Sequence, residues 1–302
     1  MKWKHYVLLV AATFVWGSGH PLGKLILEEV TPLQFAMVSS FLTAFSIFLV
    51  LLVTRRLKSL FQVQGGPLVL SLLSGSTIFF VYPILSFSAL QRIPASANSV
   101  LTASNTLFVA MLSPWFLKEK LRKMGIISLI ISFIGIPFIV FSTGGGSGFT
   151  GIGTISVFGS SLSLTGAVVA AFYTIIGRKV SAAGFALYVT LIGSFFGGLL
   201  LLPIVGLTSG FSHLFNASPK VLILIAYWGI FSGLGYGVYY HVLERMEAAR
   251  ASSFMYLSPF FAIVLSVILL KENLTFLLLF GTALVFLGIF GTQKSRIDSS
   301  PT

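Results

Sequence analysis

Residues 89–121 read ALQRIPASANSVLTASNTLFVAMLSPWFLKEKL, and residues 242–274 read VLERMEAARASSFMYLSPFFAIVLSVILLKENL. When the two stretches are aligned without gaps at a shift of 153 residues, 11 of the 33 positions are identical. Both stretches end on the same motif, Leu117-Lys118-Glu119 in the first and Leu270-Lys271-Glu272 in the second. The chain therefore contains the same structural unit twice.

The repeat extends beyond these stretches in both directions. Residues 133–136 (FIGI) align with residues 286–289 (FLGI) at the same shift, and Gly23-Lys24 aligns with Gly177-Arg178 at a shift of 154. The stretch GGGSG between the copies has the composition of a flexible linker. We divide the chain into a first repeat, a Gly-rich linker, and a second repeat with a short polar cytoplasmic tail: residues 1–143, 144–151 and 152–302.

Ten apolar stretches long enough to cross a membrane follow one another along the chain. A spanning helix needs roughly 20 apolar residues, because the hydrocarbon core is about 30 Å thick. We expect helices because lipid offers no partner to backbone polar groups, and no stretch alternates with the period of two that a barrel needs. The predicted spans are Tyr6–Ile26, Pro32–Val53, Pro67–Leu90, Ala95–Leu117, Met124–Phe141, Ile152–Gly177, Ala183–Val205, Val221–Leu243, Ala251–Leu270 and Leu274–Gly291.

Each repeat holds five spans, and this odd number places the second repeat upside down relative to the first. The topology can be tested by charge, because cytoplasmic loops carry an excess of Lys and Arg. One side collects 15 of the 19 Lys and Arg residues: Lys2, Lys4, Arg55, Arg56, Lys58, Lys118, Lys120, Arg122, Lys123, Arg178, Lys179, Arg245, Arg250, Lys294 and Arg296. The other side has four: Lys24, Arg92, Lys220 and Lys271. We therefore predict an all-α integral membrane protein of two inverted five-helix repeats, with both chain ends in the cytoplasm.

The composition agrees with a chain surrounded by lipid. Of its residues, 56% are hydrophobic and only 9% are charged, whereas soluble domains carry about 25% charged residues. The formal net charge of +12 lies in short loops, so we interpret it as a topology signal rather than a nucleic-acid surface. The absence of cysteine excludes disulfides and thiolate metal sites. The expected partners are the lipid bilayer and a small-molecule substrate, with no cofactor and no nucleic acid.

An ordered set of residues in both halves resembles a known family. The second half carries Gly235-Tyr236, Leu243, Ala248, Ala251-Ser252, Leu257-Ser258-Pro259, Ala262, residues 270–274 (LKENL), Gly281 and Gly288-Ile289. The first half carries Trp16-Gly17-Ser18, Ala89-Leu90, Pro94-Ala95-Ser96, residues 117–121 (LKEKL) and Gly135. In this order the chain resembles the EamA family of the drug/metabolite transporter superfamily.

The resemblance implies a ten-helix transporter of small organic metabolites, such as amino acids or drug-like compounds, and often an exporter. An inverted repeat lets one sequence form an inward-open and an outward-open state, which is the architecture of alternating access. We predict a multi-pass secondary transporter or facilitator of the cell membrane, with efflux as its direction. A membrane scaffold without cargo is the alternative interpretation.

The acidic residues argue against an enzyme. All seven lie at span ends, in loops or in the tail: Glu28, Glu29, Glu119, Glu244, Glu247, Glu272 and Asp298. A membrane enzyme that uses paired carboxylates or an acidic metal site would place its acidic residues deeper in the bilayer, and so would a proton pump. We therefore predict no catalytic residue and no metal ligand.

The first span holds the most informative polar residue, His20. Pro21 follows it, removes a backbone donor and is expected to kink the helix. Freed carbonyls at a kink suit a cavity wall better than a lipid face. We predict that Trp16, Ser18 and His20 bind substrate, while the competing interpretation is a histidine hydrogen-bonded between helices.

The fourth span carries Asn98, Thr102 and Asn105, whose spacing of four and three places them on one helical face. They line a cavity or clasp a neighbouring helix, and the sequence favours neither. Tyrosines offer an apolar ring with a polar tip, which suits organic substrates, although those near span ends equally suit the interfacial belt. Four tyrosines complete the predicted site: Tyr82, Tyr173, Tyr236 and Tyr256.

Overall fold

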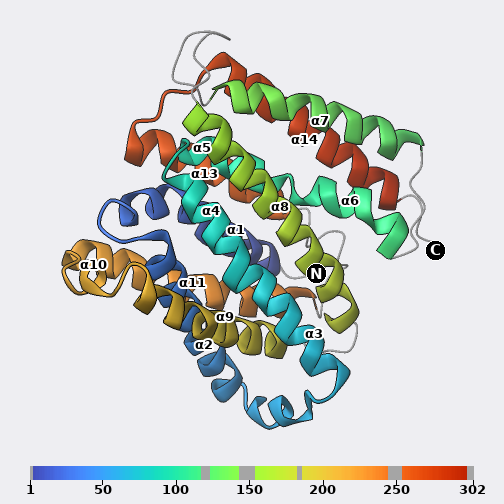
Figure 1. Cartoon of the computed structure of the whole chain (residues 1–302). Coiled ribbons are helices and arrows are strands. Elements are labelled where there is room, and N and C mark those ends of the chain that lie inside the picture. The colour runs from blue at the N-terminus through green and yellow to red at the C-terminus, as the bar shows by residue number, and fades with distance from the viewer. Residues whose placement is uncertain (1–2, 117–122, 143–153, 182–185, 244–253, 298–302) are drawn as a thin grey trace.

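The computed structural model describes residues 3–116, 123–142, 154–181, 186–243 and 254–297, and all regular structure in them is helical (Figure 1). The predicted linker, residues 144–151, lies outside this part. The elements are α1 (Lys4–Ile26), α2 (Pro32–Val53), η1 (Leu57–Gln62), α3 (Gly66–Gly75), η2 (Ser76–Val81), α4 (Tyr82–Leu90), α5 (Ala95–Ala103), α6 (Asn105–Phe116), α7 (Lys123–Ser142), α8 (Thr154–Ser181), α9 (Ala186–Leu207), α10 (Ser212–Phe215), α11 (Pro219–Leu243), η4 (Phe254–Tyr256), α13 (Leu257–Leu270) and α14 (Phe276–Ile297).

Six helices in the described residues are long and apolar enough to cross a membrane. They are α2, the continuous α3–α4 segment, α7, α8, α9 and α11. Two shorter apolar helices cover Phe254–Leu270 and Phe276–Thr292. These helices make the chain an integral membrane protein. The remaining predicted spans, α1 and the divided α5–α6 segment, carry most of the predicted polar residues.

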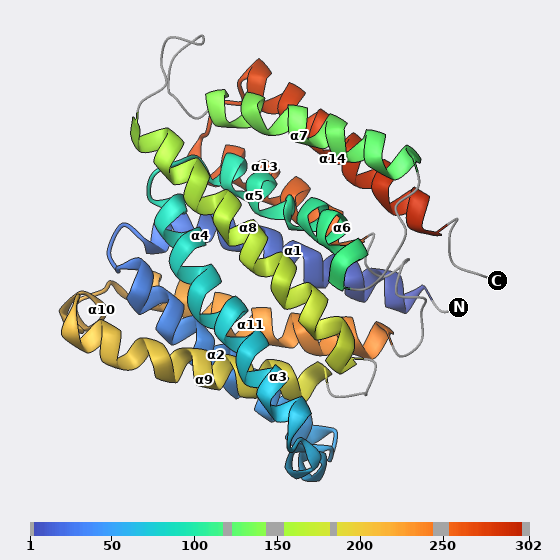
Figure 2. The same cartoon turned by 45° about the vertical axis from the view of Figure 1, so that its right-hand side comes forward.

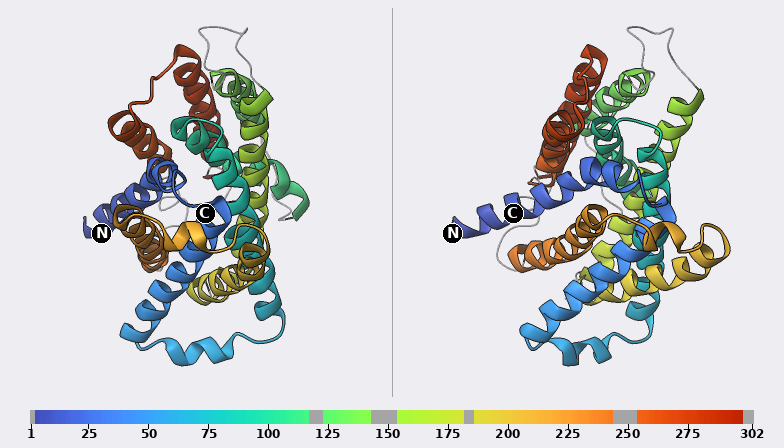
Figure 3. Two further views of the ribbon diagram at one scale, coloured as in Figure 1. Left: turned by 60° about the vertical axis from the view of Figure 1, so that its left-hand side comes forward. Right: turned by 90° about the vertical axis from the view of Figure 1, so that its left-hand side faces the viewer.

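The helices form one bundle in which α1 lies between α11 and α13 (Figure 3). On one side of α1, α2 packs against α9 and α11; on another, α8 packs against α4, α5 and α6. α7 and α14 form a closely packed pair at the edge of the bundle (Figure 2). α1 begins and α14 ends at the same end of the bundle, opposite α10, as expected for an even number of crossings (Figure 2).

The third predicted span, Pro67–Leu90, is helical throughout but contains the π-helical segment η2 just before Pro83. Proline has no backbone N–H, so the carbonyl four residues earlier, that of Phe79, loses its partner within the helix. Ser40 of α2 donates its hydroxyl to this carbonyl at 3.1 Å. A side chain of the neighbouring helix therefore satisfies the backbone group that Pro83 frees.

The fourth predicted span, Ala95–Leu117, is not one helix, which corrects the prediction; its last residue lies outside the described part. The structure divides it at Ser104 into α5 and α6. Thr102 and Ser104 donate their hydroxyls one turn back, to the carbonyls of Asn98 at 2.9 Å and Val100 at 3.3 Å. Such bonds compete with the regular helical pattern and bend helices.

Close helix contacts depend on small residues. Gly75 of α3 and Gly193 of α9 lie so near each other that a Cβ on either would overlap the backbone of the other. Gly135 of α7 and Gly281 of α14 make a similar contact between their helices. Within a membrane, packing of this kind drives helix association, because lipid tails are as apolar as the side chains that they surround.

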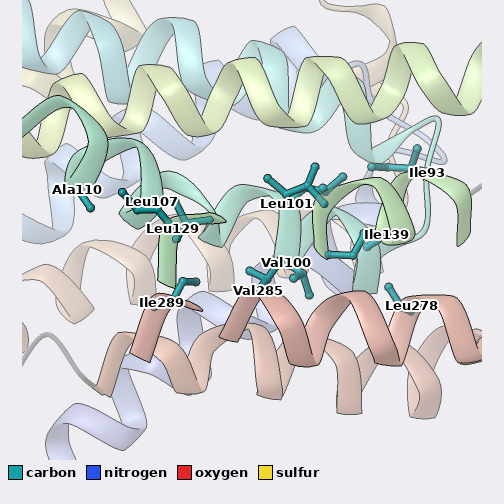
Figure 4. Close-up of a cluster of buried hydrophobic side chains, with 12 residues drawn as sticks. Ile93, Val100, Leu101, Leu107, Ala110, Leu129, Ile139, Leu278, Val285 and Ile289 are labelled. Carbon is teal, nitrogen blue, oxygen red and sulfur yellow. The ribbon is translucent and has the colours of Figure 1, made fainter. Parts of the chain in front are cut away.

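A cluster of 12 buried apolar side chains joins α5, α6, α7 and α14 (Figure 4). Val100 and Leu101 contribute from α5, Leu107 from α6, Ile139 from α7 and Val285 from α14. Dense contact among such side chains sums many small dispersion attractions. The cluster fixes α5, and with it Asn98 and Thr102, against the α7–α14 pair.

We expect Gly193→Ala to destabilise the protein by about 1–3 kcal/mol, because the added methyl group must push α3 and α9 apart. Gly66→Ala is the matched control, since a Cβ at that position meets no atom within 4 Å. Thermal unfolding in detergent, followed by intrinsic tryptophan fluorescence, compares the two variants. Equal melting temperatures would contradict this packing.

Glu29, in the turn after α1, caps the start of α11. Its carboxylate accepts hydrogen bonds from the backbone N–H of Ser218 at 2.6 Å and from the Ser218 hydroxyl at 2.8 Å. The backbone bond, then the hydroxyl bond and the nearby Lys220, hold the pKa of Glu29 below its ordinary value, outweighing a small opposing effect of burial. The contact therefore favours the ionised carboxylate.

Because this folded-state pKa is lowered, the contact stabilises the protein fully above the ordinary glutamate pKa and is lost as pH falls through the lowered value. We expect Glu29→Gln to melt below the wild type near neutral pH, and the difference to disappear in strong acid. Melting curves of both proteins over a pH series measure this. A difference that stays constant over the series would argue against the ionised cap.

Candidate functional site

Three side chains form a hydrogen-bonded chain across α1, α5 and α8. The amide nitrogen of Asn98 lies 3.1 Å from Nδ1 of His20. The hydroxyl of Ser163 donates to Oδ1 of Asn98 at 2.8 Å. Asn98 and Ser163 are fully buried, and His20 is half-buried. The structure thus joins two predicted residues and adds Ser163, which the sequence did not indicate because α8 carries several serines on different faces.

The orientation of Asn98 determines which nitrogen of His20 carries a proton. With Oδ1 directed to Ser163, Asn98 presents its amino group to Nδ1 of His20. An amide amino group only donates, so Nδ1 accepts and the proton of the neutral imidazole lies on Nε2. The chain therefore prepares His20 as a donor through Nε2–H.

A second polar pair lies one turn further along α5. Thr102 follows Asn98 by four residues and lies on the same helical face. The side chain of Tyr82, at the start of α4, lies close to the side chains of Thr102 and Ser86. Tyr82 and Thr102 were both predicted, and the structure brings them together. Four helices, α1, α4, α5 and α8, thus contribute polar side chains to one region of the bundle.

Trp16 lies one turn before His20 on α1 and belongs to a group of aromatic rings. Its ring centroid is 5.2 Å from that of Tyr236 and 6.0 Å from that of Tyr239, both on α11. Tyr236 in turn is 6.1 Å from Phe79 of η2. Nε1 of Trp16 is buried and has no hydrogen-bond partner within the described residues. A buried donor in this position gains free energy when an acceptor reaches it.

The neighbouring residues of α1 are held by α11. The Ser18 hydroxyl donates to the Val15 carbonyl at 2.7 Å and lies 3.3 Å from the hydroxyl of Tyr227. A Cβ at Gly19 would overlap the ring of Trp228, so this glycine allows the ring to lie directly against the α1 backbone. α1 remains helical through Pro21. Tyr227 and Trp228 escaped the sequence analysis because α11 is aromatic on several faces.

The other predicted residues are placed as follows. Asn105 is the first residue of α6 and is half-buried. Tyr173 is half-buried on α8. Tyr256, the last residue of η4, packs against the apolar cluster of Figure 4.

Acidic groups and metal ligands do not gather in the described part of the chain. No three His, Cys, Asp or Glu residues there lie close enough to hold a metal ion. Glu28 and Glu29 follow α1 and Glu272 follows α13, so all three lie at helix ends. The arrangement around His20 and Trp16 offers hydrogen bonds and aromatic faces.

Comparison with known proteins identifies the family of the chain. The model of the EamA-like transporter family matches the chain twice, over residues 3–141 and 157–293. The chain belongs to the EamA-like transporter family. Together with its apolar helices, this membership makes it a multi-pass membrane transporter of the cell membrane.

Several proteins that are named as transporters are similar to this chain over most or all of their length. "Uncharacterized transporter YetK" of Bacillus subtilis is 27% identical, over 98% of this chain and 89% of that protein. "Uncharacterized transporter YvbV" of the same organism is 28% identical, over 95% and 91%. An "Uncharacterized transporter" of Archaeoglobus fulgidus is 26% identical, over 97% and 100%. One crystal structure has the same fold, with a TM-score of 0.68 and 17% identity over 99% of this chain and 100% of that chain.

The hydrogen-bond chain predicts the tautomer of His20. We expect the neutral ring to carry its proton on Nε2, and Asn98→Asp to move the proton to Nδ1 or to add a second one, because a carboxylate accepts where the amide donates. Nitrogen-15 NMR of histidine-labelled protein measures this, with His20→Gln identifying the signal among the four histidines. A wild-type His20 with its proton on Nδ1 would contradict the assigned network.

Proposed function

We propose that this transporter is a secondary transporter or facilitator that moves small organic metabolites by alternating access between two inverted five-helix halves. The substrates are amino acids or drug-like compounds, and the direction is export, as the family resemblance implies. The proposal retains ten membrane-spanning helices, with both chain ends in the cytoplasm. The repeat boundaries are those of the sequence, residues 1–143 and 152–302.

One observation carries the mechanism: residues contact their own repeat equivalents. The hydroxyl of Ser132 on α7 donates to the carbonyl of Val285 on α14 at 3.0 Å, and the two residues are 153 positions apart. The ring of Phe41 on α2 lies 5.9 Å from that of Phe195 on α9, edge to face and 154 positions apart. Under two-fold symmetry a residue meets its equivalent only near the axis. Both contacts therefore support an axis through the α7–α14 and α2–α9 interfaces.

The pairing of the remaining helices supports the same symmetry. α1 packs on α11, and its equivalent α8 packs on α3 and α4, which correspond to α11 in the first half. α1 also packs on α13, while α8 packs on α5 and α6. α2 packs on α11, while α9 packs on α3 and η2. The family model likewise matches once in each half. Halves related in this way can exchange conformations and so open the site to either side.

The substrate in this proposal binds between the His20–Asn98–Ser163 chain and the rings around Trp16. His20 Nε2–H and Trp16 Nε1–H would donate to polar groups of the solute, and Trp16 and Tyr236 would pack on its apolar part. This combination suits a small solute that has both an apolar or ring-bearing portion and hydrogen-bond acceptors. The proposed substrate-binding residues are Trp16, Ser18, His20, Tyr82, Asn98, Thr102, Asn105, Tyr173, Tyr236 and Tyr256.

A scaffold without cargo remains the second candidate. It would explain the packed bundle, but it gives no role to the buried Trp16 donor, which has no hydrogen-bond partner in the described residues. Transport therefore accounts for more of the polar groups that the bundle places in its interior.

The test is solute exchange in proteoliposomes that contain the purified protein, with a mixed metabolite pool read by mass spectrometry. We expect Ser163→Ala to slow the flux about tenfold, because loss of one partner of a buried polar group costs about 1–3 kcal/mol. His20→Ala should slow it at least as much. Ser161→Ala is the matched control, since Ser161 lies on the same helix but is exposed.

Two results would count against the proposal. If no solute crosses faster than in empty liposomes under any imposed gradient, the result favours a scaffold without cargo. If Ser163→Ala and Ser161→Ala transport equally well, transport stands but the site lies elsewhere.

A further inference from the structure

At the end of the bundle predicted to face outside, charged side chains surround the turn between α4 and α5. The ammonium group of Lys24, on α1, donates to the carbonyl of Ile93 at 2.7 Å. A pocket of about 390 Å³ opens beside this turn. It is lined by Lys24, Glu28, Arg92, Ile93, Pro94, Leu270 and Glu272.

Glu272 binds the beginning of α5. Its carboxylate accepts hydrogen bonds from the backbone N–H groups of Ala95 at 2.6 Å and Ser96 at 3.1 Å, and from the Ser96 hydroxyl at 2.6 Å. The first N–H groups of a helix have no partner within it, and the N-cap residue of α5, Pro94, has no side-chain acceptor. Glu272 therefore supplies, from the second half of the chain, the anionic cap that α5 lacks.

The turn after α13 fixes the position of this carboxylate. Lys271 has left-handed backbone angles, with φ of 53°, and the N–H of Glu272 donates to the carbonyl of Ser266 at 3.3 Å. The left-handed position at a helix C-terminus is usually occupied by glycine. A side chain is tolerated there, and the turn directs Glu272 across to α5.

The contact joins the two halves at a place where it can break. α5 and Lys24 belong to the first repeat, and Glu272 belongs to the second. The groups border a pocket, so water can hydrate them once they separate. The glycine contacts of α7 with α14, by contrast, bring backbone against backbone and leave no room for water. A polar contact between the two halves that borders a water-accessible pocket can therefore break and re-form repeatedly.

We propose that Glu272, assisted by Lys24, is the latch of an outer gate that closes this end of the transporter by capping α5. The inference rests on the proposed alternating access and adds the contact that regulates it. When the latch is closed, α13 and α5 are held together above the His20–Asn98–Ser163 chain. When Glu272 withdraws, the start of α5 loses its cap and the solute path opens to the outside.

The absence of cysteine from the natural chain allows a direct test with one reporter. Thr102→Cys is introduced and its reaction with a membrane-impermeant maleimide, added outside intact cells, is timed. We expect Glu272→Ala to raise the labelling rate at least about tenfold, because loss of even one charge-assisted hydrogen bond shifts a two-state equilibrium by about that factor and the change removes three. The labelling rate in Glu272→Gln should lie between those of the wild-type latch and Glu272→Ala, because the amide keeps an acceptor oxygen but has no charge.

Two controls make the result specific. Glu28→Ala removes an exposed carboxylate at the rim of the same pocket, one that makes no hydrogen bond to α5 in the described part of the chain, and should leave the labelling rate unchanged. Ser132→Cys, buried between α7 and α14, is the control for unfolding. This cysteine should stay unreactive in every latch variant that is folded, because only unfolding would expose it. If Glu272→Ala exposes that reporter, the comparison is made with Glu272→Gln.

Equal labelling of Thr102→Cys with and without the Glu272 change, in folded protein, would overturn the latch. So would a faster rate in Glu28→Ala that matches the rate in Glu272→Ala. The assay needs no cargo, so it remains valid if no solute is found. Absence of solute flux in wild-type proteoliposomes would contradict the proposed function and leave the gating result standing by itself.

Discussion

Inside a bilayer, a backbone N–H or C=O group that loses its helical partner must find another within the protein, because lipid offers none. This constraint produces the helical bundle and also determines where it is irregular. The carbonyl that Pro83 frees is satisfied by Ser40, a side chain of another helix. The uncapped start of α5 is satisfied by Glu272. At both of these points a polar contact therefore joins two helices.

The irregular points and the polar interior occur together. Tyr82 follows the π-helical segment directly, and Thr102 lies two residues before Ser104, where α5 and α6 are divided. Polar side chains are costly on a regular helix that faces lipid, so a membrane helix that carries them places them against neighbouring helices. The resulting region combines a histidine that is hydrogen-bonded through Nδ1, a buried indole donor and aromatic faces. These groups can bind a solute through hydrogen bonds and ring contacts alone. Such binding needs no charged partner, in keeping with the absence of acidic clusters from the described residues.

Much of the architecture was predictable because hydropathy and the repeat are long-range signals. The multi-pass membrane fold and the approximate helix positions follow from apolar length and from the shift of 153, whereas the family followed from the resemblance of the ordered motif residues. The division at Ser104 was not predictable, because hydroxyl back-bonding depends on rotamers that the sequence does not specify. Asn98 and His20 could be proposed from their polarity, whereas Ser163 could not, because its role follows from the rotation of α8 about its axis. Glu272 stood out only as a repeated motif, and its partners lie 176 and 177 residues away.

The central claim, that two inverted halves exchange conformations, can be tested most directly by paired distances. Spin labels on Ser88 and Leu269 report on one end of the bundle; labels on His241 and Phe116, their equivalents at a shift of 153, report on the other. Double electron–electron resonance in lipid, with and without added solute, gives both distance distributions. The account predicts that one pair lengthens as the other shortens, so that the two distributions exchange. Distances that change together, or that stay fixed under every condition, would contradict it.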